Sequence, residues 1–401
     1  SVCGLLDGGA RVSAFEGAGL ETKVVHKDRA ELTRYLKEKK FDLIHWHNSG
    51  EPEPFLLSCV SDSGHRPAII RTNVFGHRDV SSEARMVDIN IFISRFCYLR
   101  YCKKYRCDTP EFYAANKVIY NPVDFEQIEA ARPSPEEKAR LKAQYGIPAD
   151  ALVIGRIGRP DDSKFGSICI EMMPYLLKQQ PKVKFVIVGM TQKKMERIKK
   201  LGLLKHFVII EPTADEKKIY SIYHIMDVYA HSATWGESFG CSIAESMACG
   251  KPVVTHATPF WDNAQIELVD HEKTGFVANV PRLYAQAVDM LLREPDQALL
   301  IGEAGLKKAK ALYDIKSSAR QTEKVYLEAL QDKRAVLSPT LTDHLKTGCA
   351  PYAAMQELKS FSEEYQSRLS KSFGRPVLTE RLQLLGGNII DMLRVIKERV
   401  M

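Results

Sequence analysis

Short apolar runs alternate with helical patterns over roughly the first 330 residues of this 401-residue chain. Several runs are apolar throughout, which is typical of strands buried on both faces of a parallel sheet. We expect strands at residues 22–25, 42–46, 68–71, 89–93 and 117–119, and then at 151–157, 184–188, 207–210, 228–231, 252–255 and 275–277. The alternation with helices predicts an α/β fold made of two doubly wound units.

The boundary between the two units is expected near residues 133–149. Ser134 is a good helix cap and Pro135 suits the first helical position, whereas Gly146 and Pro148 would break the helix. We therefore expect an N-terminal domain over residues 1–148 and a second domain over 149–313. The remaining segments are a crossover over 314–336, with a helix at 315–330 that returns to the first domain, and a helical C-terminal extension over 337–401.

The extension has apolar residues at three- and four-residue spacing in segments 352–369 and 378–400. Such apolar faces would pack on the N-terminal domain or against another subunit, so an oligomer is one expectation.

Composition excludes several classes of protein. A net charge of +7 is mild for 401 residues and argues against a dedicated nucleic-acid binder. The nine cysteines show no zinc-binding spacing, which favours free thiols in a cytoplasmic protein. No apolar stretch is long enough to span a membrane, and no signal-peptide pattern is present. The chain begins without Met, which suggests a start inside a longer chain.

The segment richest in candidate chemistry is residues 235–254, with the sequence Trp-Gly-Glu-Ser-Phe-Gly-Cys-Ser-Ile-Ala-Glu-Ser-Met-Ala-Cys-Gly-Lys-Pro-Val-Val. A glycine-containing loop leads into a helix that we expect to begin near Phe239 and end at Gly250. Free N–H groups at a helix start suit a phosphate, because the helix dipole favours its negative charge. Gly236 and Gly240 would let the backbone approach a ligand closely.

Two carboxylates flank this helix start. Eight residues of helix would separate Glu237 from Glu245 by roughly 12 Å along the axis. That gap has room for a diphosphate between a sugar at one carboxylate and a ribose at the other, since a carboxylate accepts two hydrogen bonds from a diol. The alternative is two solvated helix glutamates, but the surrounding loop, glycine and helix pattern favours a ligand site.

This run resembles the retaining GT-B glycosyltransferases of family 4, also described as glycosyl transferases group 1. Their signature is two glutamates separated by seven residues, here residues 238–244. The resemblance covers about residues 8–330 and implies two Rossmann-like domains facing across a cleft. It also implies that Glu237 contacts the donor sugar and that Glu245 binds the ribose. Ser238, Phe239 and Gly240 would hold the sugar and the diphosphate.

A second loop, residues 158–166, follows the first strand of the second unit. The family places an Arg and a Lys here on the donor diphosphate, and Arg159 and Lys164 match those positions. An ordinary basic surface loop is the alternative. Asp161 and Asp162 have a spacing more typical of turn chemistry than of a metal site. The resemblance implies neither metal nor cofactor, because the cationic side chains and the helix start would stabilise the leaving group.

Gly8 and Gly9 resemble the glycine pair that opens the first helix in this family, where it faces the diphosphate. Two glycines on their own more often mark a turn. Only about 13 residues separate Gly9 from the strand at 22–25, so a usual first strand and long first helix barely fit. Either the native first strand is missing or this domain is reduced.

The acceptor side is less defined. His45 and His47 lie on one face of their expected strand, and without a third ligand they favour packing or an acceptor contact over a metal pair. Many relatives carry a histidine after the next strand, where this chain has Asn73 and an offset His77. This departure leaves a direct contact between histidine and donor without support.

A basic helical face could bind an anionic membrane. Arg100, Lys103 and Lys104 share one side of an expected helix and are flanked by Tyr98, Tyr101 and Tyr105. Basic residues with interfacial aromatics suit a bilayer surface, which would place the protein at the inner face of the membrane. A simple solvated helix face is the alternative.

The resemblance implies transfer of a sugar from a nucleotide-diphosphate sugar to an acceptor hydroxyl with retained anomeric configuration, in the synthesis of a glycan, polysaccharide or glycolipid. Glu237, Arg159 and Lys164 would be the catalytic residues. The alternatives are a GT-B phosphorylase, which would use inorganic phosphate, and a non-catalytic nucleotide-sugar-binding protein, which would bind without turnover. Base, sugar and acceptor are open.

Overall fold

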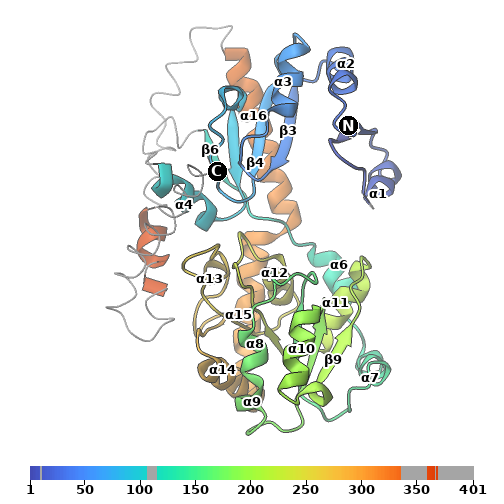
Figure 1. Cartoon of the computed structure of the whole chain (residues 1–401), viewed down its shortest axis with the longest axis vertical. Coiled ribbons are helices and arrows are strands. Elements are labelled where there is room, and N and C mark those ends of the chain that lie inside the picture. The colour runs from blue at the N-terminus through green and yellow to red at the C-terminus, as the bar shows by residue number, and fades with distance from the viewer. Residues whose placement is uncertain (10, 106–114, 336–358, 366, 369–401) are drawn as a thin grey trace. The chain divides into compact units, whose positions relative to one another are not determined.

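The computed structural model describes residues 1–9, 11–105, 115–335, 359–365 and 367–368 (Figure 1). Its contacts divide the chain into two compact units. Unit 1 comprises residues 1–92, 100–118 and 321–353, and unit 2 comprises 93–99, 119–320 and 354–401, each as far as it is described. Residues 103–104, in the basic face considered above, have side chains outside the described set, and so does most of the predicted 337–401 extension.

Unit 1 contains two parallel sheets. The strands β1 (Val2–Gly4) and β2 (Thr22–Val24) pair with each other, and β3 (Leu43–Asn48), β4 (Ala68–Asn73), β5 (Ile89–Phe92) and β6 (Asn116–Val118) form the second sheet in that order. Its helical elements are α1 (Val12–Gly17), α2 (Arg29–Lys39), α3 (Pro54–Asp62), η1 (Ser82–Met86) and the later part of α4 (Arg95–Tyr105). A first strand and first helix both precede β2 because each is very short.

Unit 2 is built on a six-stranded parallel sheet. Its strands are β7 (Val153–Ile157), β8 (Lys184–Val188), β9 (Phe207–Ile210), β10 (Val228–Ala230), β11 (Val253–Thr255) and β12 (Gly275–Val277). Their order across the sheet is β12-β11-β10-β7-β8-β9. The chain thus builds outwards from β7 to one edge and then restarts at β10, which is the strand order of a Rossmann sheet. Every strand predicted from the sequence overlaps a strand in the structure.

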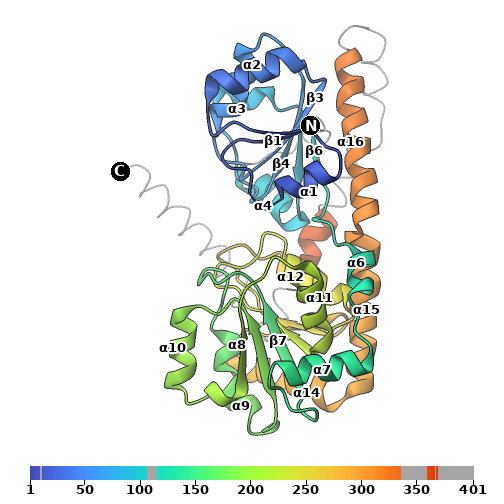
Figure 2. The same ribbon diagram turned by 90° about the vertical axis from the view of Figure 1, so that its right-hand side faces the viewer.

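Helices cover both faces of this sheet. Figure 2 shows β7 with α8 (Ile168–Glu171) and α10 (Gln192–Lys200) on one side and α11 (Glu216–Ile225) and α12 (Cys241–Ala248) on the other. The unit also contains α9 (Met173–Leu176), η2 (Leu204–His206), α13 (Gln265–Leu268), α14 (Pro281–Arg293) and α15 (Pro295–Tyr313). The core is apolar because β7 and β8 are buried on both faces, and Ile154, Phe185 and Tyr284 are fully buried in it.

The change of unit falls at residues 118–119, earlier than the predicted boundary near 133–149. The helices α6 (Phe125–Ala130) and α7 (Pro135–Gln144) belong to unit 2 because both pack against α11. The predicted helix start is present: Ser134 and Glu137 form a reciprocal capping box at the N-terminus of α7. A pattern of apolar residues locates a helix, but it does not say which neighbour the helix packs on.

The helix α16 (Ile315–Ala335) begins in unit 2, and its residues from Gln321 onwards belong to unit 1, as expected for the crossover. Figure 2 shows it as one continuous helix after α15. Within unit 1, the Tyr326 hydroxyl lies 2.7 Å from Nδ1 of His45 on β3.

One expectation about packing is refined and another needs correction. The described part of the C-terminal extension belongs to unit 2, where Phe361 and Tyr365 are buried and the Tyr365 ring stacks on that of Phe96, a residue within the predicted N-terminal domain. Two tyrosines of α4 are not interfacial anchors: Tyr98 and Tyr101 are 4% and 7% exposed, and the Tyr101 ring packs 5.1 Å from that of Phe92. A side chain inside the core cannot insert into a membrane surface. The prediction that tyrosines anchor this helix in a bilayer is therefore wrong for Tyr98 and Tyr101.

Candidate functional site

The candidate site lies where the strand order of unit 2 reverses. β7 and β10 are neighbours in the sheet, yet the chain leaves them towards opposite edges. Crevices form at such a point, outside the carboxyl ends of the strands. The loop after β7 carries Lys164 and the loop after β10 carries Glu237, so the two loops singled out by the sequence meet at this edge.

Glu237 and Lys164 form an ion pair. Nζ of Lys164 lies 2.9 Å from Oε2 of Glu237 and donates to the carbonyl oxygen of Gly236 at 3.0 Å. Both side chains are largely buried, at 24% exposed for the lysine and 17% for the glutamate. Among the described residues, no acceptor takes the third N–H of this ammonium group. That proton is available to a ligand.

The second partner of Glu237 is a buried histidine. Nε2 of His231 lies 3.4 Å from Oε1 of Glu237, and Nδ1 lies 2.8 Å from the Thr255 hydroxyl. Burial alone would raise the pKa of Glu237, but the hydrogen bond from His231 and the charge of Lys164 outweigh it and lower this pKa to about 2. An ionised carboxylate can only accept, so Nε2 carries the proton of the neutral imidazole and Nδ1 accepts from the hydroxyl of Thr255.

The backbone of Glu237 is fixed by a network of buried amides and hydroxyls. Its N–H donates to Oε1 of Gln265 at 3.0 Å, and Nε2 of Gln265 donates to the Thr258 hydroxyl at 2.7 Å. Gly236 has a φ of +66°, and a Cβ there would lie 1.6 Å from the carbonyl oxygen of Asp262. Only glycine fits this close approach of two loops. The carboxylate is therefore held by the fold rather than left on a free loop.

The helix after this loop has an open N-terminus. α12 begins at Cys241, two residues later than predicted, because Gly240 adopts φ +108° as its N-cap. No side chain caps this helix, and no described residue accepts a hydrogen bond from the backbone N–H of Phe239, Gly240 or Cys241. Free N–H groups at the positive end of a helix dipole form a binding place for an anion.

Ser238 and Phe239 are buried residues that anchor the loop before α12. The carbonyl oxygen of Ser238 accepts from the Ser94 hydroxyl at 2.6 Å, and the Phe239 ring packs edge-on against Tyr313 at 5.2 Å. Both residues are more than nine-tenths buried. Only their backbone groups can meet a ligand, which agrees with the backbone role that the resemblance implies for Phe239.

Glu245 is one turn into α12, where its Oε2 accepts from the Tyr223 hydroxyl at 2.9 Å. Burial raises the pKa of Glu245 to about 7, with a smaller opposing effect from Tyr223. A carboxyl group with this pKa is half-ionised near neutral pH. It can accept hydrogen bonds from a diol once it has lost its proton.

Two arginines, Arg156 in β7 and Arg159 in the loop after it, have different environments. Arg159, predicted on the diphosphate, is exposed, and its guanidinium has no hydrogen-bond partner among the described residues. Arg156 is 2% exposed, donates to the carbonyl oxygen of Lys164, and lies 3.9 Å from the centroid of the Phe165 ring. Arg156 thus fixes the backbone of Lys164, a role that the sequence analysis did not assign.

The remaining predicted residues lie in unit 1. Gly8 and Gly9 do lie between β1 and α1, and a Cβ on Gly8 would approach Cγ2 of Val12 to 2.6 Å. The rings of His45 and His47 pack 4.4 Å apart, and burial lowers the pKa of both, that of His45 to about 4. They are therefore neutral at physiological pH.

Asn73 is fully buried and holds its own loop together. Its Nδ2 donates to the carbonyl oxygen of His77 at 2.7 Å, and its Oδ1 accepts from the N–H of Gly76 at 2.8 Å. A Cβ on Gly50 would collide with this amide at 2.3 Å. These contacts give Asn73 a structural task at the position where the family resemblance led us to expect a histidine.

Sequence reasoning missed three residues of the hydrogen-bond network around Glu237. They are His231 and Gln265, which bond to Glu237, and Thr258, which bonds to Gln265. Each is polar and at least nine-tenths buried. A signal exists for His231, because it directly follows β10, where the carboxyl end of a parallel strand delivers side chains to the site. Gln265 is 28 residues away from Glu237, and nothing in local spacing connects them.

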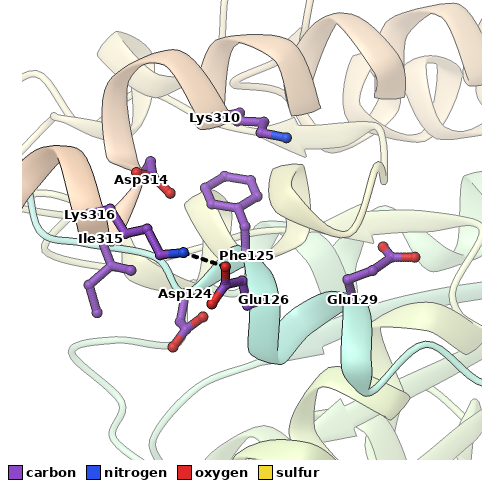
Figure 3. Close-up of a pocket in the computed structure, with 8 residues that line it drawn as sticks. All are labelled: Asp124, Phe125, Glu126, Glu129, Lys310, Asp314, Ile315 and Lys316. Carbon is purple, nitrogen blue, oxygen red and sulfur yellow. Dashed lines mark hydrogen bonds and ion pairs between the residues drawn. The ribbon is translucent and has the colours of Figure 1, made fainter.

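Other features of the described residues lie elsewhere. No group of three His, Cys, Asp or Glu side chains within the described ranges is arranged to hold a metal ion. No described helix is both long and apolar enough to cross a bilayer. Figure 3 shows a pocket of about 380 Å³ beside α6 and the start of α16, lined by mixed charges and crossed by an ion pair between Lys316 and Glu126. None of its lining residues belongs to the cluster around Glu237.

Comparison with known proteins matches these features to one family. Residues 137–308 match the family described as glycosyl transferases group 1. A D-inositol 3-phosphate glycosyltransferase of Kineococcus radiotolerans is 27% identical over 216 residues, which cover 49% of each chain. The chain therefore spans about half the length of the curated relatives it matches.

Solved structures extend the likeness to the fold. A glycosyltransferase from Rickettsia africae superimposes with a TM-score of 0.68 at 20% identity, covering 80% of this chain and 88% of that one. HepE of Anabaena, crystallised with UDP and glucose, gives a TM-score of 0.66 at 20% identity, with 81% and 91% covered. The chain thus has the GT-B fold with two Rossmann-like domains, and its predicted resemblance to the glycosyl transferases of group 1 is confirmed over the segment that contains Lys164 and Glu237.

Proposed function

We propose that this protein is a glycosyltransferase that moves a sugar from a nucleotide-diphosphate donor to an acceptor hydroxyl. One observation carries the proposal: at the sheet's switch point, an ionised Glu237 bound to Lys164 lies directly before the open N-terminus of α12. This arrangement offers a carboxylate for sugar hydroxyls and cationic and N–H groups for a diphosphate. The matched family and the UDP-bound HepE structure support the same assignment.

Each residue then has a distinct task. Glu237 accepts hydrogen bonds from hydroxyls of the donor sugar, and His231 keeps its carboxylate oriented. The free N–H groups of Phe239, Gly240 and Cys241 bind the diphosphate, together with the third N–H of Lys164 and the exposed guanidinium of Arg159. Glu245 accepts from the ribose. Uridine diphosphate is the first nucleotide to test.

The chemistry that we propose retains the anomeric configuration and needs no metal. The acceptor oxygen bonds to the anomeric carbon on the face from which the diphosphate departs, and the leaving phosphate oxygen takes the acceptor's proton. The cations and helix dipole stabilise the charge that develops on the leaving group, so no side-chain nucleophile takes part. Proton NMR of the product and activity in excess EDTA test these two features.

A donor screen tests the proposal directly. The protein is incubated with UDP-, GDP- and ADP-sugars without an added acceptor, and release of the nucleoside diphosphate is followed. We expect slow hydrolysis of one donor, reduced by about 100-fold in Glu237→Gln and in Lys164→Met, because each variant removes a charge that the bound donor needs.

Glu303→Gln is the matched control, since this glutamate is exposed on α15 of the same unit. Circular dichroism establishes that all variants are folded. The proposal fails if no nucleotide or nucleotide sugar binds to the folded wild-type protein, and the assigned residues fail if their variants hydrolyse the donor at the wild-type rate.

A further inference from the structure

Three large aromatic side chains are exposed beside the candidate donor site. Trp235, Phe260 and Trp261 are 56%, 46% and 49% exposed. The two indole rings stack on each other with centroids 5.6 Å apart and planes only 16° from parallel. We refer to these three residues as the aromatic platform. A folded protein gains from burying such rings, so their joint exposure marks a surface for a partner or ligand.

The platform is tied to the donor loops by backbone hydrogen bonds. The N–H of Trp235 donates to the carbonyl oxygen of Ser163 at 3.0 Å, one residue before Lys164. The carbonyl oxygen of Trp235 accepts from the N–H of Asp262 at 3.2 Å, and Trp235 itself is two residues before Glu237. All of these residues belong to unit 2. The platform therefore occupies a fixed position at the edge of the Glu237 cluster.

Acidic residues lie next to the platform in the chain and on the loop that adjoins it. Asp262 follows Trp261 directly, and the exposed Asp161 and Asp162 lie on the loop whose Asp162 carbonyl accepts from the Thr234 hydroxyl at 2.8 Å. Three carboxylates oppose an anionic bilayer, which attracts basic patches instead. They suit a neutral carbohydrate, because carboxylates accept hydrogen bonds from hydroxyls while the negative face of an indole attracts the polarised C–H groups of a sugar ring.

We propose that the aromatic platform binds a neutral sugar ring of the acceptor, so that the acceptor is a glycan or a glycoside. This inference rests on the proposed function and specifies its acceptor. A sugar stacked on Trp261 would be presented at the edge of the donor site, with its hydroxyls directed by the neighbouring carboxylates. No residue assigned to the donor takes part.

The tryptophans themselves report on binding. The chain has three, and Trp46 is 6% exposed in the core of unit 1. A neutral quencher such as acrylamide therefore reaches mainly Trp235 and Trp261. The probes are maltotriose, cellotriose, chitotriose and mannotriose. We expect at least one to lower the quenching constant about twofold at saturation, and we expect calorimetry to show heat of binding for the same saccharide.

Variants identify the surface. Trp261→Ala should abolish the protection and the binding heat, whereas Trp261→Phe, which keeps an aromatic ring, should restore part of both. Leu204→Ala is the control, because this residue is 46% exposed elsewhere on unit 2. Circular dichroism verifies the fold of each variant.

Three results would overturn the proposal: no protection by any saccharide, protection that survives in Trp261→Ala, or protection by phosphatidylserine vesicles in place of saccharides. The last result would make the platform a membrane contact. Donor hydrolysis by the wild-type protein is measured in parallel. Its absence would defeat the proposed function, whereas saccharide protection requires no donor, so the two failures are distinguishable.

Discussion

Glu237 and Glu245 are eight positions apart in the chain, but their environments shift their pKa values in opposite directions. Glu237 pairs with Lys164 and His231, and its pKa falls to about 2. Glu245 has the phenol of Tyr223 as its hydrogen-bond partner, and burial raises its pKa to about 7. A lysine stabilises the negative charge of a buried carboxylate and lowers its pKa, whereas a neutral phenol stabilises that charge only weakly. Near neutral pH the carboxylate of Glu237 is thus ionised, whereas the ionisation of Glu245 changes with pH.

Nucleotide binding should therefore depend on pH. The pKa of Glu245 lies above its ordinary value, so the fold favours the protonated form and the carboxylate appears only as the pH rises through about 7. A ribose diol binds the carboxylate better, and we expect affinity for the nucleoside diphosphate to rise up to about tenfold between about pH 6 and 8, as the ionised fraction does.

Calorimetry in buffers of different ionisation enthalpy measures this effect and the proton released on binding. Glu245→Gln has no proton to lose, so its affinity should not change over that interval beyond what the phosphate group contributes. Equal pH dependence in wild type and Glu245→Gln would contradict the assignment.

Gly236 is the residue on which the loop geometry depends. A Cβ there would lie 1.6 Å from the carbonyl oxygen of Asp262 and 2.3 Å from the hydroxyl of Thr258. Gly202 has nearly the same φ, +69°, but a Cβ there meets nothing within 4 Å. Alanine at Gly202 would therefore cost only the free energy of a left-handed backbone, whereas alanine at Gly236 would add the cost of a steric collision.

We expect Gly202→Ala to lower the free energy of unfolding by about 1 kcal/mol, which is the usual cost of placing alanine in this conformation. Gly236→Ala should cost several times more or displace the loop, and it should lose nucleotide binding. Urea unfolding and a binding titration measure both. Equal destabilisation by the two substitutions would show that the loop accommodates the methyl group.

At the scale of elements, the described residues 359–365 and 367–368 brace the loop beside Glu237. The Tyr365 hydroxyl accepts from Nδ2 of Asn263 at 2.9 Å, and Oδ1 of Asn263 accepts from the N–H of Thr258 at 2.8 Å. Thr258 in turn holds Gln265, the partner of the Glu237 backbone. Arg368, three residues after Tyr365, forms an ion pair with Asp270 and so adds a second link between this segment and unit 2. The described part of the C-terminal extension thus reaches the candidate donor loop through buried hydrogen bonds.

Tyr365→Phe should lower the free energy of unfolding by about 1–2 kcal/mol, because it leaves the buried amide of Asn263 without an acceptor. Phe361→Ala should cost more, about 3–5 kcal/mol, since it empties a buried site. Thermal unfolding measures both, with the exposed Glu363→Ala as the control. If Phe361→Ala has no more effect than Glu363→Ala, the segment does not pack on unit 2 in solution.

At the scale of the whole molecule, two helices in the described part of the chain carry residues of both units. The helix α16 passes from unit 2 to unit 1 at Gln321, and α4 begins with residues 95–99 of unit 2 and continues in unit 1. The start of α4 is held by Glu267, which is 5% exposed and accepts from the N–H groups of Arg95 and Phe96 and from the Tyr120 hydroxyl. Ser94 caps the same helix, because its hydroxyl accepts from the N–H of Cys97 at 3.1 Å. The carboxylate of Glu267 adds a negative charge at this N-terminus, which the helix dipole favours.

Glu267→Gln should therefore loosen residues 93–99. An amide has one acceptor oxygen, so at least one of these three donors would face an NH₂ group, at a cost of about 1–3 kcal/mol. Hydrogen exchange should accelerate in 93–99 more than elsewhere, with Glu272→Gln, an exposed change nearby, as the control. Unchanged exchange in this segment would show that Glu267 is not its anchor.

The sequence by itself determined the local structure and indicated the family resemblance. Continuous apolar runs predicted each strand of the second unit because such strands are buried on both faces. The order of residue types in the segment 235–254 indicated a resemblance to the glycosyl transferases of group 1. Ser134 likewise predicted where α7 begins, since a capping box joins residues only three positions apart. Each of these signals concerns residues close together in the chain.

Only the tertiary structure decided which distant residues meet. Glu237 pairs with Lys164 from 73 positions away and binds Gln265 from 28 positions further on, and Tyr365 supports the same loop through Asn263. The stacking of Trp235 on Trp261 and the burial of Tyr98 and Tyr101 arise in the same way. Helical and strand periods say which side of an element is apolar, but the packing of elements decides what that side contacts, and pKa values follow from those contacts.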